Sequence, residues 1–108
     1  MERAATISLN PAVLGELQAG FLGDRRRAEN EETLRSFLAA PRVRVLDITA
    51  ETARRYAAIV SHLRAAGTPL PVNNVWIAAS AMEHGLTVLT TDSHFLRVPE
   101  ILVELAAP

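Results

Sequence analysis

The chain has 108 residues, of which 49% are apolar and 21% charged, and its formal net charge is −1. This length suffices for one small domain with a single core, and the apolar fraction excludes an intrinsically disordered chain. The near-zero net charge gives no global argument for nucleic-acid binding. The chain has no cysteine, which excludes a disulfide framework and thiolate metal sites.

Membrane insertion and secretion find no support in the sequence. No apolar run approaches the roughly 20 residues of a membrane span. The first ten residues, MERAATISLN, have neither the basic flank nor the apolar core of a signal peptide. We therefore expect a cytoplasmic protein of bacterial type with no membrane partner.

The first predicted elements are a short strand at Ala4–Leu9 and a helix that runs to about Leu22. Asn10 followed by Pro11 is a strong helix start, because Asn can cap the first turn and Pro suits the first helical position. An apolar face at helical spacing contains Val13, Leu14, Leu17 and Phe21. Glu16 lies on a different face, where a solvated carboxylate is the simplest interpretation.

A second helix should follow the break at Gly23, with Asp24 as its cap. Arg25, Arg26 and Arg27 open this helix against its own dipole, and nearby glutamates can offset that charge. The three arginines have two interpretations: a solvated charged face, or a contact with phosphate groups, which guanidinium binds in bidentate fashion. Its buried stripe should be Leu34, Phe37 and Leu38.

A strand at Val43–Asp47 and a third helix come next. Thr49 is the predicted cap of this helix, and Thr52 is expected to be too short to complete a capping box. Gly67 should end the helix. Two further groups follow from the helical period: an apolar stripe at Ala53, Tyr56, Ala57, Val60 and Leu63, and water-facing side chains at Arg54, Arg55 and His62.

The most informative stretch is residues 69–99, PLPVNNVWIAASAMEHGLTVLTTDSHFLRVP. After an extended proline segment, Asn73 or Asn74 should cap a largely buried helix that runs from 75 to 84. Gly85 should end this helix with a positive φ. A strand at 86–90 then leads directly to Asp92, in a polar loop at the carboxyl end of a strand, where open α/β sheets place their chemistry. A last strand or irregular edge occupies 98–105.

The predicted element order is β-α-α-β-α-α-β-β. Helices between successive short apolar strands indicate an α/β fold in three layers, with a short, mainly parallel sheet flanked by helices. We expect a single domain, 1–108, without internal repeats or linkers.

Two patterns resemble a known family. One is WIAASA, EHGL and then TTDSHF after a strand; the other consists of Ser8, Glu16, Leu17 and Gly20, which match "S…EL..G". Together they are similar to PIN-domain proteins, and the nearest branch is the VapC-type toxins. These are metal-dependent ribonucleases of toxin–antitoxin pairs. The resemblance implies a Mg²⁺- or Mn²⁺-dependent endoribonuclease with RNA as substrate, and a cognate antitoxin as partner.

The resemblance also implies site residues. Glu16 and Asp92 match acids that hold the metal ion, and Asn74 stands where the family normally has aspartate. An asparagine can ligate through its amide oxygen but carries no charge. Residues implied on the substrate side are Ser8, Thr90, Arg25, Arg26 and Arg27.

The chain departs from the family at its beginning. The family's first strand carries an aspartate, and this chain begins at what resembles the second strand, so the expected fold is an N-terminally truncated PIN domain. In the family's strand order, 3-2-1-4-5, the first strand is central. Without it, either Ala4–Leu9 pairs directly with Leu86–Thr90, or a second chain closes the gap and the protein is a homodimer.

Three functional hypotheses remain open at this point. The first is the VapC-type ribonuclease. The second is a catalytically degenerate PIN remnant that acts in binding or dimerisation, which the missing acid and Asn74 favour. The third is an unrelated small α/β domain, in which Asp92 caps a short turn at Ser93–Leu96 and His94 is an exposed surface residue.

Overall fold

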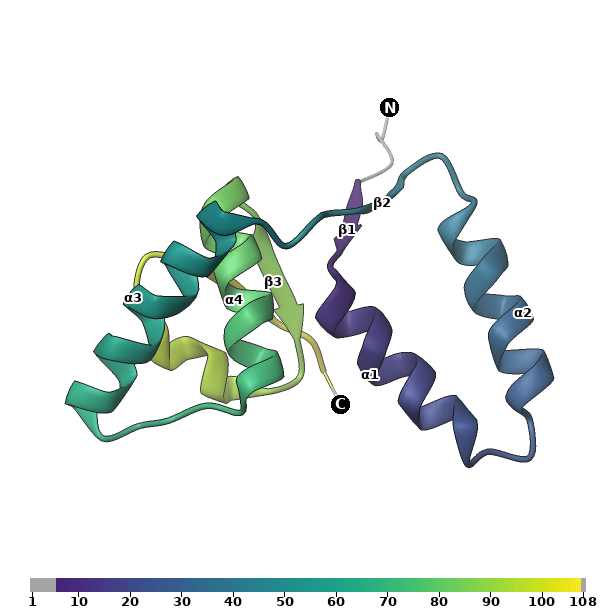
Figure 1. The fold of residues 1–108 in the computed structure, drawn as a ribbon, viewed down its shortest axis with the longest axis horizontal. Coiled ribbons are helices and arrows are strands. Elements are labelled where there is room, and N and C mark those ends of the chain that lie inside the picture. Colours follow the sequence, from purple (N-terminus) through teal and green to yellow (C-terminus); the bar gives the residue numbers. More distant parts are fainter. Residues whose placement is uncertain (1–5, 108) are drawn as a thin grey trace. The chain divides into compact units, whose positions relative to one another are not determined.

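The structure is a computed structural model that describes residues 6–107 (Figure 1). The chain divides into two compact units, Met1–Asp47 and Ile48–Pro108. The elements follow the predicted order β-α-α-β-α-α-β-β, with one short 3₁₀ helix added between the last two strands. The predicted α/β class is confirmed: four helices accompany short parallel strands.

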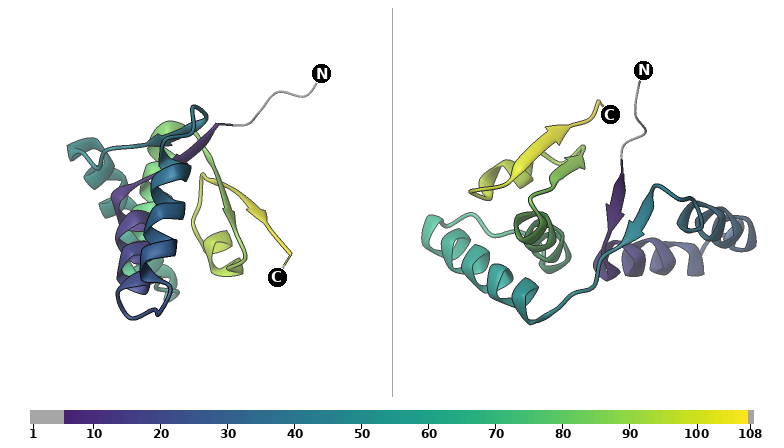
Figure 2. Two further views of the ribbon diagram at one scale, coloured as in Figure 1. Left: turned by 90° about the vertical axis from the view of Figure 1, so that its right-hand side faces the viewer. Right: turned by 90° about the horizontal axis from the view of Figure 1, so that it is seen from above.

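The first unit consists of a parallel strand pair joined by two helices. Strand β1 (Ile7–Leu9) leads into α1 (Pro11–Leu22) and α2 (Arg27–Leu38), and the chain returns in β2 (Val43–Val45). The two strands lie side by side, with Ile7 opposite Val43 and Leu9 opposite Val45 (Figure 2). Parallel neighbours require a long crossover, which the helical pair supplies.

The start of α1 is as predicted. The Asn10 side chain is buried, and its Oδ1 accepts a hydrogen bond from the amide of Val13 at 3.2 Å, with Pro11 at the first helical position. The predicted apolar face is covered less than expected, because no residue of α1 is buried and Leu17 is 39% exposed. In α2 only Leu34 of the predicted stripe is buried.

The turn before α2 differs from the prediction. Asp24 does not cap the helix directly; α2 begins at Arg27 and Arg26 is its N-cap residue. Asp24 acts one turn earlier, where its Oδ1 accepts the Arg26 amide at 2.8 Å and its Oδ2 accepts from the Asn30 side chain at 3.4 Å. The carboxylate therefore stabilises the turn that precedes the helix rather than the helix end itself.

The second unit has α4 at its centre. Helix α3 (Ala50–Ala66) packs against α4 (Val72–His84), which also contacts β3 (Thr87–Thr90). A 3₁₀ helix, η1 (Ser93–Arg97), connects β3 to β4 (Leu102–Leu105), and these strands pair in parallel (Figure 2). The buried core is formed by Ile59, Leu63, Val75, Ala78, Ala79, Ala81, Val88, Phe95 and Val98.

Helix α4 begins earlier than predicted. The carbonyl of Pro71 accepts hydrogen bonds from the amides of Asn74 and Val75, at 3.0 and 3.1 Å, so helical bonding starts there. Asn73 and Asn74 therefore lie in the first turn and do not cap it. The predicted helix ends are confirmed, because Gly67 and Gly85 have φ values of 71° and 65°, a conformation that a side chain disfavours.

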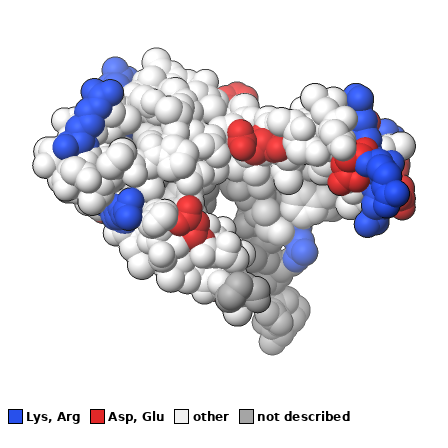
Figure 3. Space-filling model, turned by 90° about the horizontal axis from the view of Figure 1, so that it is seen from below, with Lys and Arg blue, Asp and Glu red and all other residues white. Residues whose placement is uncertain are grey.

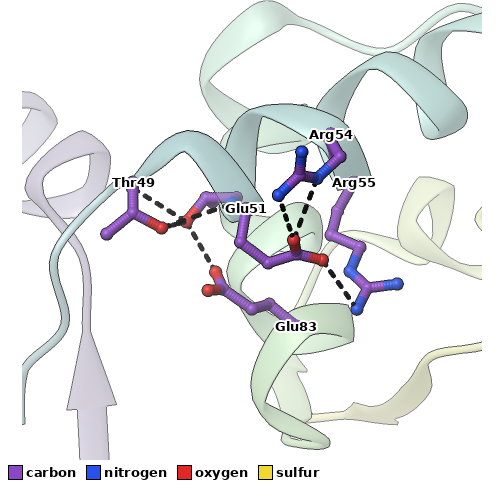
Figure 4. Close-up of polar contacts among 6 residues, drawn as sticks. Thr49, Glu51, Arg54, Arg55 and Glu83 are labelled. Carbon is purple, nitrogen blue, oxygen red and sulfur yellow. Dashed lines mark hydrogen bonds and ion pairs between the residues drawn. The ribbon is translucent and has the colours of Figure 1, made fainter.

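The start of α3 corrects a second prediction. Thr52 does complete a capping box: its Oγ1 accepts the Thr49 amide at 3.0 Å, while Thr49 Oγ1 accepts the Thr52 amide at 3.5 Å. The fully buried Thr52 hydroxyl also donates to Glu83 Oε1 on α4, at 2.5 Å (Figure 4).

The prediction that Arg54 and Arg55 of α3 face water is only partly right. Arg54 is exposed, but Arg55 is half-buried, and both arginines form ion pairs with Glu51 at 2.9 Å (Figure 4). The shared carboxylate lies one turn before both guanidinium groups, a spacing at which helical side chains meet.

The strands form two sheets of two strands each, β1–β2 and β3–β4. The predicted direct pairing of Ala4–Leu9 with Leu86–Thr90 is not among the strand pairings of residues 6–107, and Ala4 and Ala5 lie outside the described residues. The last strand is shorter than expected because η1 and a turn at Glu100, with φ 62°, precede it. Within the described residues no helix is both long and apolar enough to cross a membrane.

We predict that Thr52→Val destabilises the protein. The substitution keeps the side chain's shape but leaves the Thr49 amide and the Glu83 carboxylate without their shared partner. The expected loss in the free energy of unfolding is about 1–3 kcal/mol, measured by urea denaturation. Thr33→Val, at an exposed position of α2, is the matched control. Equal effects of the two substitutions would contradict the role assigned to Thr52.

Candidate functional site

The loop after β3 holds Asp92 in a defined position. Thr90 ends the strand, and its Oγ1 accepts the Asp92 amide at 3.0 Å. Asp92 Oδ1 accepts the amide of His94 at 2.9 Å and lies 3.2 Å from the Nδ1 of the same residue. Both contacts with His94 fall on Oδ1 of the carboxylate. Thr90 and Asp92 are thus brought together as predicted.

Buried apolar side chains that follow Asp92 in the chain anchor the loop in the core of the second unit. Phe95 and Val98 are each 4% exposed, and the Val98 amide donates to the Phe95 carbonyl at 3.1 Å. The Arg97 guanidinium donates to the carbonyl of Pro69, at 3.4 Å, which ties η1 to the segment before α4. Because its base is packed, Asp92 has a fixed backbone although its side chain is partly exposed.

His94 is a neighbour of Asp92 that the sequence analysis left out of the site. Its side chain is 55% exposed, yet its ring contacts the Asp92 carboxylate. The available signal was the Asp-x-His spacing in a tight turn, where an aspartate commonly bonds the backbone two residues on. The cap predicted for Asp92 in the third hypothesis is present, and it uses Oδ1 of the carboxylate.

Asn74 lies in the first turn of α4 and is half-buried. Its backbone is fixed by the bond to Pro71 and by the buried neighbour Val75. Trp76 stacks on Tyr56 of α3, with ring centroids 4.1 Å apart and planes at 25°. The beginning of α4 is therefore rigidly held, which fixes where the Asn74 side chain starts.

The remaining predicted residues belong to the first unit. Glu16 is exposed in the middle of α1, and Ser8 is half-buried in β1 opposite Arg44 of β2. The buried cap Asn10 lies between them in the chain and fixes the bend from strand to helix. Sequence reasoning named Asn10 as a helix cap only, although its 3% exposure makes it the anchor of this bend.

Two of the three consecutive arginines, Arg26 and Arg27, lie on a solvated charged face, as one of the two interpretations predicted. Arg26 pairs with Glu29 at 3.3 Å, and Arg27 pairs with Glu31 at 2.9 Å, all on the surface of α2. Basic and acidic side chains consequently lie side by side over the turn that joins α1 to α2 (Figure 3). Among the ion pairs of the described residues, Arg25 takes part in none, so it is the arginine of the three that is available to a phosphate.

The predicted ligand residues offer the kind of atom that a hard cation prefers, but neither unit offers enough of them. Glu16, Asp92 and Asn74 offer only oxygen ligands, which Mg²⁺ and Mn²⁺ prefer. The first unit supplies Glu16 alone, and the second supplies Asp92 and Asn74. In the part of the chain that the structure describes, no three acidic or histidine side chains lie together in a group that could hold a metal ion. Each unit by itself therefore has an incomplete ligand set.

Comparisons with known proteins identify the family of this chain. The PIN domain family model matches residues 1–101. Ribonuclease VapC4 of Mycobacterium tuberculosis is 36% identical over 90 residues, which is 83% of this chain and 69% of the relative. Ribonuclease VapC2 of Rickettsia felis is 28% identical over 100 residues, 92% of this chain and 73% of the relative.

Solved structures show the same fold. VapBC2 of Rickettsia felis bound to a promoter DNA fragment has a TM-score of 0.84 at 28% identity, and covers 93% of this chain and 74% of its own. DNA-bound VapBC of Salmonella typhimurium has a TM-score of 0.82 at 28% identity, with coverages of 90% and 73%. VapBC-5 of Mycobacterium tuberculosis has a TM-score of 0.73 at 31% identity, with coverages of 94% and 79%.

The fold and the Asp92 loop define the class of this protein, a small α/β protein with an acidic residue where a parallel strand ends. The match of the family model to residues 1–101 then identifies the family within this class. The chain belongs to the PIN-domain family, and its curated relatives are VapC ribonucleases.

The contribution of the Asp92 cap to stability can be measured by substitution. Asp92→Ala removes the bond to the His94 amide and is expected to cost about 0.5–1 kcal/mol in the free energy of unfolding. Asp92→Asn keeps an acceptor oxygen and removes only the charge, so its effect should be a few tenths of a kcal/mol, or about 0.3. Chemical denaturation measures both. If the two variants lose equal stability, the cap contributes nothing.

Proposed function

We propose that this chain is the toxin of a toxin–antitoxin pair and an endoribonuclease that depends on a divalent metal ion. The observation that carries the proposal is Asp92 at the end of β3, with its backbone amide bound by Thr90 and its carboxylate bound by His94, in a chain that matches the PIN family over residues 1–101. The names of the curated relatives support the activity.

Glu16, Asp92 and Asn74 are the proposed metal ligands. A bound Mg²⁺ or Mn²⁺ would activate water and stabilise charge on the cleaved phosphodiester. The chain's own contribution is positional: Thr90 binds the Asp92 backbone amide, and His94 binds Oδ1 of the Asp92 carboxylate. Two carboxylates and one neutral amide attract a dication less strongly than three carboxylates do.

The substrate side of the proposed site contains Ser8, Thr90 and the arginines at the turn before α2. Arg25 is the one we expect to contact RNA phosphate, because Arg26 and Arg27 are already paired with glutamates. Arginine suits this role, since its planar fork matches two phosphate oxygens.

Partners and organisation follow from the relatives. The solved neighbours are VapBC complexes, and their names support an antitoxin as the protein partner of this chain. We further propose that both units are parts of one domain, since the family model spans them, and that the protein is a cytoplasmic homodimer.

A second function is favoured by one observation, the amide at position 74. If the metal ion binds too weakly for catalysis, the chain is a PIN-derived module that binds a partner without cutting RNA. The ribonuclease and the binding module would have the same fold, so a measurement of metal affinity distinguishes them more directly.

Titration of Mn²⁺ into the full chain, measured by calorimetry, tests the proposed ligands. Asn74→Asp should tighten binding about tenfold, because a carboxylate replaces a neutral ligand near a dication. Glu104→Asp, which keeps its charge on exposed β4, is the control and should leave the affinity unchanged. If Asn74→Asp does not alter the affinity, Asn74 lies outside the metal site.

Cleavage of a fluorescent single-stranded RNA in Mn²⁺ tests the activity itself. Glu16→Gln and Asp92→Asn should each lower the rate by about 100-fold or more, since each removes a ligand charge at the reacting phosphate. Glu32→Gln, on the exposed surface of α2, is the matched control. Metal binding without any RNA cleavage, by this chain and by Asn74→Asp alike, would favour the binding module instead.

A further inference from the structure

Two of the three proposed metal ligands, Asn74 and Asp92, lie toward the same end of the second unit. Helix α4 begins just before Asn74, and its 13 residues carry the chain about 20 Å away, at about 1.5 Å per residue. The chain turns at Gly85, and β3 then runs back alongside α4 toward Asp92 (Figure 1). The position of Asp92 relative to Asn74 therefore depends on how the loop after β3 is held near the beginning of α4.

The segment before α4 has few backbone groups with which to fix its own position. Proline occupies two of the three positions in Pro69–Pro71, so Leu70 supplies the single amide of this stretch. The Pro71 carbonyl accepts the first bonds of the helix, and the Pro69 carbonyl accepts a hydrogen bond from Nη1 of Arg97, at 3.4 Å. A side chain of η1 thus supplies a bond that a backbone ladder cannot supply here.

The Arg97 end of this bond is rigid. The 3₁₀ helix η1 begins at Ser93, directly after Asp92, and ends at Arg97. Phe95 and Val98 are buried in the core, and the Val98 amide donates to the Phe95 carbonyl at 3.1 Å. Because only this short, packed helix separates Asp92 from Arg97, the Asp92 loop and the backbone of Arg97 move together.

The Asn74 end of the bond is constrained in the same way. Proline fixes φ at positions 69 and 71. The Asn74 amide donates to the Pro71 carbonyl at 3.0 Å, and the next side chain, Val75, is buried. The bond between Arg97 and Pro69 therefore joins two stiff segments, and each of them leads to one of the two proposed ligands.

This bond lies at the surface, so its role can be separated from folding. Arg97 and Pro69 are both exposed. The apolar core of the second unit is built from other residues. Loss of the bond is therefore expected to loosen the two segments relative to each other while the unit stays folded.

We propose that Arg97 is a positioning residue of the metal site: it holds the Asp92 loop to the segment that leads into α4, and so fixes the separation between Asp92 and Asn74. The inference rests on the proposed function, because it takes both residues to be ligands of the metal ion. A fixed separation favours binding, since the ion then does not have to order the two ligands itself. Arg97 uses one N–H in this bond, so a lysine ammonium can replace it.

Calorimetric titration of Mn²⁺ into the full chain tests this role. Arg97→Met removes the donor and keeps an unbranched apolar stem, and it should weaken Mn²⁺ binding about fivefold, the worth of one net hydrogen bond. Arg97→Lys restores a donor and should bind Mn²⁺ within about twofold of the unaltered chain. Arg64→Met, at an exposed position in the last turn of α3, is the matched control and should leave the affinity unchanged.

Hydrogen exchange of the ¹⁵N-labelled chain without metal tests the loosening directly. The His94 amide, which is bonded to Asp92 Oδ1, should exchange about fivefold faster in Arg97→Met than in the unaltered chain. Arg97→Lys and Arg64→Met should not change this rate. The amide of the buried Ile59, in the middle of α3, should exchange at the same rate in all four proteins.

The outcomes distinguish failure of this inference from failure of the proposed function. If the unaltered chain and Arg97→Met bind Mn²⁺ equally well, Arg97 does not position the site, even where His94 exchanges faster, because the bond then stabilises the loop alone. Equal weakening by Arg97→Met and Arg97→Lys also overturns the inference, since the hydrogen bond is then not the cause. An unaltered chain that binds no Mn²⁺ refutes the proposed metal site itself, and the role of Arg97 with it.

Discussion

The close packing of α3 against α4 is the interaction on which the second unit depends. Alanines at 78, 79 and 81 are almost fully buried, and such small side chains let the helix backbones approach while Ile59 and Leu63 fill the space between them. Thr52 and Glu83 add a partly buried hydrogen bond across the same pair. Because β3 packs on α4, and the Asp92 loop follows β3 directly, this helix pair sets the position of the Asp92 loop within the second unit.

The first unit has no comparable core. Leu34 is its one buried apolar residue among those described, and α1 and α2 leave an open apolar groove of about 330 Å³ between them, lined by Leu17, Phe21, Asn30, Thr33, Leu34 and Phe37. The surface buried on folding falls as a unit becomes smaller, so a unit of this size is at best marginally stable by itself. Its helices are held locally instead, by the Asn10 cap and by the ion pairs of α2, which are exposed and contribute little each.

Local signals in the sequence predicted most elements, and the errors have physical causes. Asn10-Pro11, Gly67 and Gly85 acted as predicted because caps depend on a few neighbouring residues. The prediction that Asn73 or Asn74 caps α4 was wrong, because the Pro71 carbonyl already accepts the first hydrogen bonds of the helix. The Thr52 capping box was missed because its hydroxyl is held in place by Glu83, 31 residues away, and sequence distance conceals such a contact.

The candidate site, like the fold, could be predicted only where neighbouring residues in the sequence determine it. Asp92 could be placed because a strand end and a turn define it locally, whereas no local pattern encodes the tertiary structure that the proposed metal site of Glu16 and Asp92 requires. The neutral Asn74 has two opposing consequences in the proposed site. One charge fewer weakens the attraction for a dication, and it also removes repulsion between neighbouring carboxylates when no metal ion is bound. Metal affinity and metal-free stability therefore change in opposite directions at this position, so selection for a stable fold and selection for catalysis would choose different residues there.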